Sequence, residues 1–322
     1  MHHPLRRTVL ALSLLAAAGV AGAQAAWPSK PIRFVVPFGP GGANDLMGRA
    51  AAEGASKVLG QPVIVENRPG AGAVLGADVV AKSAPDGYTF LIGAAGVVTN
   101  SVIMSKMPYK DSDLVPVAMV GVAPSFIVVA ADSPAKTLKD LVDESKASKN
   151  TLNFSTAGTG STPHFVAEML KSKSGARLEI IPYKSGSEGV AAVIGHQVDA
   201  TSEASIVVIP QIKGGKLRAL ASTWTSRITA APDLSTATEQ GFPDVQIGHW
   251  AGVLAPRGTP DAILEKMNRA IDQGMKSAAI HDRLVAQGIE PIGGTRASFV
   301  KFIGEERARL TKVARAANMK AD

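Results

Sequence analysis

The fold is decided by residues 32–59, which are IRFVVPFGPGGANDLMGRAAAEGASKVL. The apolar run 32–37 predicts a buried strand, the glycines after it predict a tight turn, and the alanine-rich residues 45–59 predict a helix. Residues 63–66 and 88–92 predict two more strands. Alternation of strands and helices at this spacing indicates an α/β fold, with a parallel sheet covered by helices on both faces.

A similar unit begins at residue 152. Residues 152–155 predict a strand, 156–160 a glycine-rich turn and 161–171 a helix, and a further strand is expected at 178–182. In open α/β sheets ligands bind at the carboxyl ends of the strands, where the first amides of a helix favour anions. Two such turns facing each other would hold an anionic molecule at both ends. Ordinary strand-to-helix turns that bind nothing are the alternative.

The last third of the chain predicts a return to the first unit. Residues 250–255 predict a late strand, and only helical patterns follow Leu254. We therefore expect two lobes, residues 26–127 with 252–322 and residues 128–251, joined by crossovers near 125–131 and 248–254 that form a hinge. A single packed domain is the alternative.

An uncharged stretch at residues 114–131 raises the question of a membrane helix. Pro116, Gly121 and Pro124 interrupt it, so it predicts two buried strands instead.

The N-terminus has the pattern of a secretory signal peptide, predicted over residues 1–25. Arg6 and Arg7 precede an uncharged run at 8–20, and small residues follow. Cleavage after Ala25 fits the small-residue rule, and cleavage after Ala23 is the alternative. A membrane anchor is the other interpretation, but this run is short for a bilayer core, which needs about 20 residues. We expect an exported, soluble protein of the periplasm.

Composition excludes several classes of function. The 322 residues are 46% hydrophobic and 19% charged, which fits a packed globular protein, and the absence of cysteine excludes disulfide scaffolds and thiolate metal sites. The 34 basic residues are spread along the chain, so we expect no nucleic-acid partner. We expect no catalytic residue, metal or cofactor: the standard hydrolase, zinc and phosphate-loop motifs are missing, and Pro163 stands where a dinucleotide fingerprint needs glycine.

Two side chains near the turns invite a chemical role. His164 and Glu168 stand four apart on a helix and suit an acid–base pair, the basis for a rival hypothesis of a hydrolytic α/β enzyme. We expect instead that His164 orients its turn or donates to a ligand. Asp45, at a helix start, is expected to cap backbone amides beside the site.

Several strings resemble the Bug family, the periplasmic substrate-binding proteins of tripartite tricarboxylate transporters. They are residues 27–45, 65–72, 85–89, 158–164, 182–184, 195–199 and 255–260. The resemblance implies a two-lobed, type II-like Venus-flytrap protein with a ligand cleft between its lobes. It also implies capture of a small carboxylate without catalysis, for membrane transporter subunits. We expect a monomer, and a ligand sensor for a membrane kinase remains an alternative with the same fold.

The resemblance also implies the ligand-binding residues. By position these are Phe38, Gly39, Pro40, Gly41 and Asp45 in the first lobe, and Thr156, Gly158, Thr159, Gly160, Ser161 and His164 in the second. One departure is Glu203, an acid where the family often has an apolar or small residue. We include Glu203 in the site, where it would disfavour a second carboxylate on the ligand.

Overall fold

The computed structural model describes residues 27–149 and 151–321, so the predicted signal peptide lies outside the described residues. The elements are, in chain order, β1 (Ile32–Val36), α2 (Ala43–Leu59), β2 (Val63–Asn67), η1 (Ala71–Ala73), α3 (Val74–Ala81), β3 (Thr89–Gly93), α4 (Gly96–Ile103), η2 (Asp111–Asp113), β4 (Leu114–Ala130), α5 (Leu138–Ala147), β5 (Leu152–Thr156), α6 (Thr162–Ser174), β6 (Leu178–Pro182), α7 (Gly186–Ile194), β7 (Ala200–Ala204), α8 (Ser205–Lys213), β8 (Leu217–Ser222), β9 (Gly248–Pro256), α9 (Asp261–Met275), α10 (Ala278–Ala286), β10 (Glu290–Pro291) and α11 (Arg296–Ala316).

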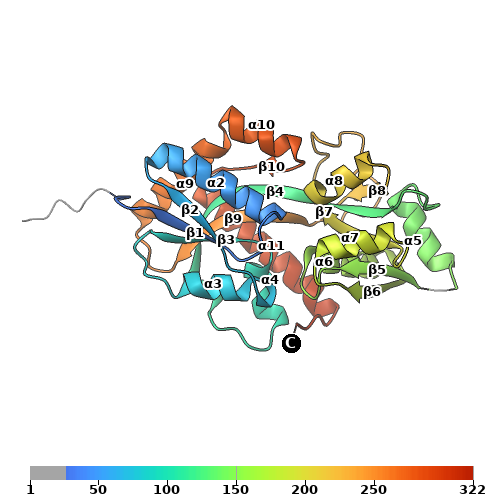
Figure 1. Cartoon of the computed structure of the whole chain (residues 1–322). Coiled ribbons are helices and arrows are strands. Elements are labelled where there is room, and N and C mark those ends of the chain that lie inside the picture. The colour runs from blue at the N-terminus through green and yellow to red at the C-terminus, as the bar shows by residue number, and fades with distance from the viewer. Residues whose placement is uncertain (1–26, 150, 322) are drawn as a thin grey trace, which may run out of the picture.

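The strands form one curled sheet that runs through two lobes. Its order is β2-β1-β3-β9-β4-β7-β5-β6, and β8 and β10 pair with β4 outside this path. In one lobe β1 pairs in parallel with β2 and β3, and in the other β5 pairs in parallel with β6 and β7. The α/β class and the two lobes, at the left and right of Figure 1, are confirmed.

Strand β4 belongs to both lobes. It pairs with β9 from Leu114 to Pro124 and with β7 from Ser125 onward, without a break in its 17 residues. The prediction of two strands in this stretch was therefore wrong. Pro116 and Gly121 lie at shifts of register in the pairing with β9, so the strand absorbs them as irregularities rather than ending there.

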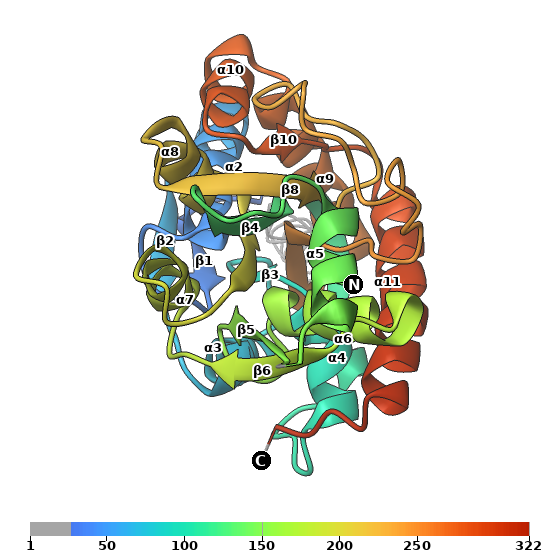
Figure 2. The ribbon, with the colours of Figure 1, turned by 90° about the vertical axis from the view of Figure 1, so that its right-hand side faces the viewer.

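Helices cover both faces of the sheet, as the apolar pattern predicts. Buried side chains of α2 and α9 form one cluster with β1 and β9, and those of α3, α4, α5, α6 and α11 form another. In the second lobe α7 and α8 share a third cluster with β4. Figure 2 shows α2, α7 and α8 on the left side of the molecule and α4, α5, α6 and α11 on the right.

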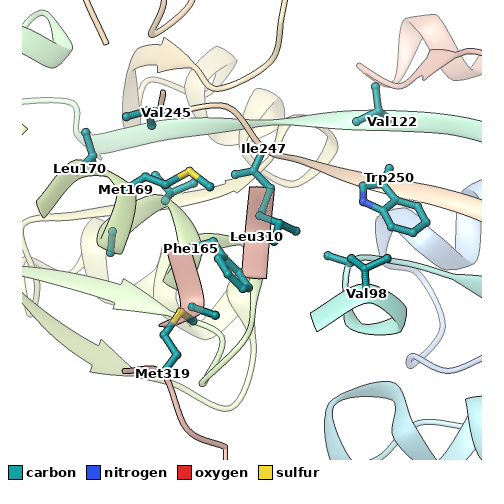
Figure 3. Close-up of a cluster of buried hydrophobic side chains, with 14 of the residues drawn as sticks. Val98, Val122, Phe165, Met169, Leu170, Val245, Ile247, Trp250, Leu310 and Met319 are labelled. Carbon is teal, nitrogen blue, oxygen red and sulfur yellow. The ribbon is translucent and has the colours of Figure 1, made fainter. Parts of the chain in front are cut away.

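One apolar cluster joins the lobes. Figure 3 shows Leu310 of α11 between Phe165 and Met169 of α6 on one side and Val98 of α4 and Trp250 of β9 on the other. All five belong to one buried cluster. The lobes therefore share a core on the side of α4, α6 and α11.

The expectation that no strand follows Leu254 was wrong in one place. Strand β10 has two residues, Glu290 and Pro291, which pair with Val122 and Gly121 of β4. Pairing this short depends on the long strand already in place, and it leaves no periodic signal in the sequence.

Within the described residues, no helix is both long and apolar enough to span a membrane.

Helix α2 is held at a close crossing with α9. A Cβ on Gly54 would lie 2.7 Å from the Cα of Gly274, which is too close for the backbones to keep their places. This crossing fixes the helix that begins at the first glycine-rich turn.

The close crossing of α2 and α9 leads to a testable prediction about the stability of the protein. Gly54→Ala should lower the free energy of unfolding by about 1–3 kcal/mol, because the two helices must move apart. Gly304→Ala in α11 is the matched control: no atom lies within 4 Å of the new methyl group. It should leave stability unchanged or raise it by about 0.5–1 kcal/mol. Urea unfolding measures both, and equal stability of Gly54→Ala and the wild type would contradict the account.

Candidate functional site

The first turn connects β1 to α2 and carries four of the predicted residues, Phe38, Gly39, Pro40 and Gly41. Residues 39–42 are exposed, and a Cβ on Gly39, Gly41 or Gly42 would meet no atom within 4 Å. Gly41 has a φ of +85°, which explains the choice of glycine there. The turn thus presents its backbone to open space at the carboxyl end of β1.

Asp45 holds this turn rather than facing solvent. Its side chain is 2% exposed, and Oδ2 accepts hydrogen bonds of 2.9 Å from the Gly41 amide and from Nε of Arg49. Oδ1 accepts from Asn67 Nδ2 at 2.8 Å, and the same nitrogen donates to the Phe38 carbonyl. Asp45 was predicted to lie beside the site. Asn67 was not among the predicted site residues, although it belongs to the string 65–72 that resembles the Bug family.

The charge of Asp45 is well stabilised. Burial by itself would raise the pKa of this carboxyl group, but the hydrogen bonds from Arg49, Gly41 and Asn67 outweigh it and hold the pKa below its ordinary value. All three bonds favour the ionised form. Asp45 is therefore a positioning residue for the turn, with its negative charge matched by Arg49.

The second turn connects β5 to α6 and carries Thr156, Gly158, Thr159, Gly160 and Ser161. Gly158 and Gly160 have φ values of +91° and +78°. A Cβ on Gly158 would meet nothing within 4 Å, whereas one on Gly160 would lie 2.3 Å from Cδ1 of Ile103 in α4. The turn of the second lobe therefore lies directly against the first lobe at Gly160 and has open space at Gly158.

His164 holds the second turn as Asp45 holds the first. Its Nδ1 accepts from the Gly160 amide at 3.3 Å, so Nε2 carries the proton in the neutral ring. Burial lowers the pKa of His164. The charge of Lys171 also lowers it, and the charge of Glu168 raises it. In both turns the residue four positions after a glycine accepts from that glycine's amide.

Other amides of the two turns remain open. Those of Gly39 and Gly42 in the first turn, and of Gly158 and Thr159 in the second, donate to no atom of the described residues. They lie just before helices α2 and α6, whose dipoles favour negative charge at this end. Thr156 adds a buried hydroxyl that has no hydrogen-bond partner among the described residues.

His164 and Glu168 share a groove of about 310 Å³ between α6 and the edge strand β6. Thr156 and Thr159 of the second turn also line this groove, as do Lys171 and Glu179. Glu168 accepts from Lys171 Nζ at 3.1 Å, so its carboxylate is paired. Within the part of the chain that the structure describes, no group of three or more His, Asp or Glu side chains could hold a metal ion.

Glu203, the last predicted site residue, lies near the end of β7 and is buried. Its side chain contacts Gly186 at the start of α7, where a Cβ would lie 1.5 Å from Oε2. Its Oε1 lies 3.4 Å from Nε2 of His249 in β9. Sequence reasoning gave His249 no role and did not connect Gly186 with the site.

A family model described as the tripartite tricarboxylate transporter family receptor matches residues 47–319. The chain belongs to this family. Protein BugT of Bordetella pertussis is 37% identical over 306 residues, which are 94% of each chain. The resemblance to the Bug family is therefore confirmed.

Two solved structures that are similar to this chain contain carboxylate ligands. Rpa4515 of R. palustris with adipate has a TM-score of 0.83 and 30% identity, covering 91% of this chain and 99% of that one. MatC of Rhodopseudomonas palustris with bound malate has a TM-score of 0.78 and 29% identity, covering 89% and 99%.

Asp45 provides a test of how the first turn is held. Asp45→Asn should lower the free energy of unfolding at neutral pH by about 1–3 kcal/mol, because the amide loses the ion pair and opposes one donor with another. The folded pKa is depressed, so the stability that the carboxylate contributes is fully present above about pH 4. It is lost as the pH falls through the folded value.

The measurement is urea unfolding of wild type and Asp45→Asn between pH 7 and pH 2, with Asp143→Asn as an exposed control expected to change little. The gap between wild type and Asp45→Asn should close in acid. A gap that stays constant to pH 2 would show that the charge of Asp45 is not what holds the turn.

Proposed function

We propose that this protein is a periplasmic solute-binding protein that captures a small carboxylate and delivers it to the membrane subunits of a tripartite tricarboxylate transporter. The observation that carries the proposal is the pair of turns with open amides, one at the carboxyl edge of each lobe's sheet. Adipate and malate, the ligands of two relatives, are small carboxylates of the kind that such amides recognise. Export through a cleaved signal peptide and action as a monomer belong to the same proposal.

We propose that the ligand lies in a cleft between residues 26–127 with 252–322 and residues 128–251. The change of partner in β4 between Pro124 and Ser125 supports the first crossing between the lobes. The start of β9 at Gly248 supports the second. The open amides of Gly39, Gly42, Gly158 and Thr159 would contact the ligand, and Asp45 and His164 would fix their geometry.

We also propose that the ligand leaves unchanged. Both members of the His164 and Glu168 pair already have other partners: Nδ1 of His164 accepts from the Gly160 amide, and the Glu168 carboxylate is paired with Lys171. Magnetic resonance of adipate and malate incubated with the protein should show no product. Turnover that is lost in His164→Gln would favour the enzyme instead.

The second turn can be tested with one substitution. Gly158→Val should abolish binding of adipate, malate or 6-aminohexanoate, whichever the wild type binds most tightly, because the side chain enters the open space that a carboxylate needs beside the amides. The measurement is calorimetric titration.

Gly241→Val is the matched control. Gly241 has a φ of +89° against +91° for Gly158, and its Cβ would also meet nothing within 4 Å, so both variants carry similar backbone strain. Both should lose similar thermal stability, and only Gly158→Val should lose binding. Full affinity in a folded Gly158→Val protein would remove this turn from the site.

A further inference from the structure

Glu203 is a buried carboxylate with one oxygen unused. Its side chain is 9% exposed. Oε1 accepts from the amide of the next residue, Ala204, at 2.7 Å. Oε2 accepts no hydrogen bond from the described residues. Oε2 is not among the fully buried polar atoms that lack a partner in the described residues, so this oxygen keeps some exposure and is open to a donor from outside the protein.

No cationic side chain in the described part of the chain neutralises this carboxylate. Among the described residues, the only basic group within ion-pair distance of Glu203 is His249, whose Nε2 lies 3.4 Å from Oε1 and forms no hydrogen bond. Burial lowers the pKa of His249, although Glu203 acts in the opposite direction. The imidazole is therefore neutral at ordinary pH and supplies no positive charge to Glu203.

The contacts of this pair place it between helix starts of the two lobes. Glu203 lies against Gly186, the first residue of α7. His249 precedes Trp250 in β9, whose carbonyl accepts a 3.0 Å hydrogen bond from Asn44 in the first turn of α2. Figure 1 shows α2 beginning in the middle of the molecule, with α7 on the other side of that region. Glu203 thus lies near the turn that, under the proposed function, contacts the ligand.

We propose that Glu203 determines ligand specificity by binding a hydrogen-bond donor, ammonium or hydroxyl, at the end of the ligand opposite its carboxylate. This inference rests on the proposed function. A donor would satisfy Oε2 with a charge-assisted hydrogen bond, whereas a second carboxylate would face a buried like charge at short range. A site built to pair with a donor rejects an analogue that lacks it, because its own polar group is then left unpaired. The ligand class is therefore a monocarboxylate that carries an amino or hydroxyl group, rather than a dicarboxylate.

The test uses two ligand series of matched length. One consists of 6-aminohexanoate, 6-hydroxyhexanoate and adipate, and the other of 4-aminobutanoate, 4-hydroxybutanoate and succinate. Calorimetry should show that the wild type binds the best donor-bearing member of a series about tenfold or more tightly than its dicarboxylate. The amino and hydroxy members distinguish a cationic donor from a neutral one.

Glu203→Gln keeps the shape of the side chain and removes its charge. It should weaken binding of the donor-bearing ligand by about tenfold or more and strengthen binding of the matched dicarboxylate. Glu144→Gln removes the same charge from α5 in the same lobe and should match the wild type. If Glu203→Gln does not fold, Gly186→Ala replaces it, because its methyl group would displace Oε2.

The outcomes separate this inference from the proposed function. A wild type that prefers dicarboxylates, with a ranking unchanged in Glu203→Gln, would overturn the role of Glu203 and leave the carboxylate-binding function intact. A wild type that binds no carboxylate of any kind would overturn the proposed function and this inference with it.

Discussion

The rest of the structure depends on the hydrogen bonding of β4. A buried strand of 17 residues must satisfy its backbone groups along its whole length, and β4 does so with β9 and β10 in one lobe and with β7 and β8 in the other. Because β4 passes from one set of partner strands to the other without ending, it fixes the position of the two parts of the sheet relative to each other. Trp250 on the neighbouring strand packs edge-on against Phe302 of α11 and strengthens the same junction.

The two glycine-rich turns solve one physical problem in the same way. A turn that offers amides to an anion is itself short of hydrogen bonds, so something must hold its shape. Asp45 and His164 each accept one glycine amide from four residues earlier in the chain and leave the neighbouring amides open. The positioning groups add no unpaired negative charge beside the proposed ligand site, since Arg49 matches the carboxylate of Asp45 and the imidazole of His164 is favoured in its neutral form.

Local signals in the sequence were sufficient to predict the two strand–turn–helix units. Apolar strands, positive-φ glycines and alanine-rich helices act within a few residues, so β1 with α2 and β5 with α6 were predicted nearly to their ends. The continuity of β4 was not, because Pro116 and Gly121 act as breakers unless a partner strand accommodates them, and Gly121 lies close against the backbone of Glu290. The surroundings of Glu203 also required the structure, because His249 is 46 residues further along the chain and its own sequence context carries no signal.

A crystal structure with bound ligand tests most directly whether a carboxylate binds between the two turns. The protein would be purified from the periplasm with whatever ligand it retains, or soaked with the tightest ligand of the matched series. We predict a ligand carboxylate within hydrogen-bond distance of the amides of Gly158 and Thr159 or of Gly39 and Gly42. A bound ligand that contacts neither turn would contradict it.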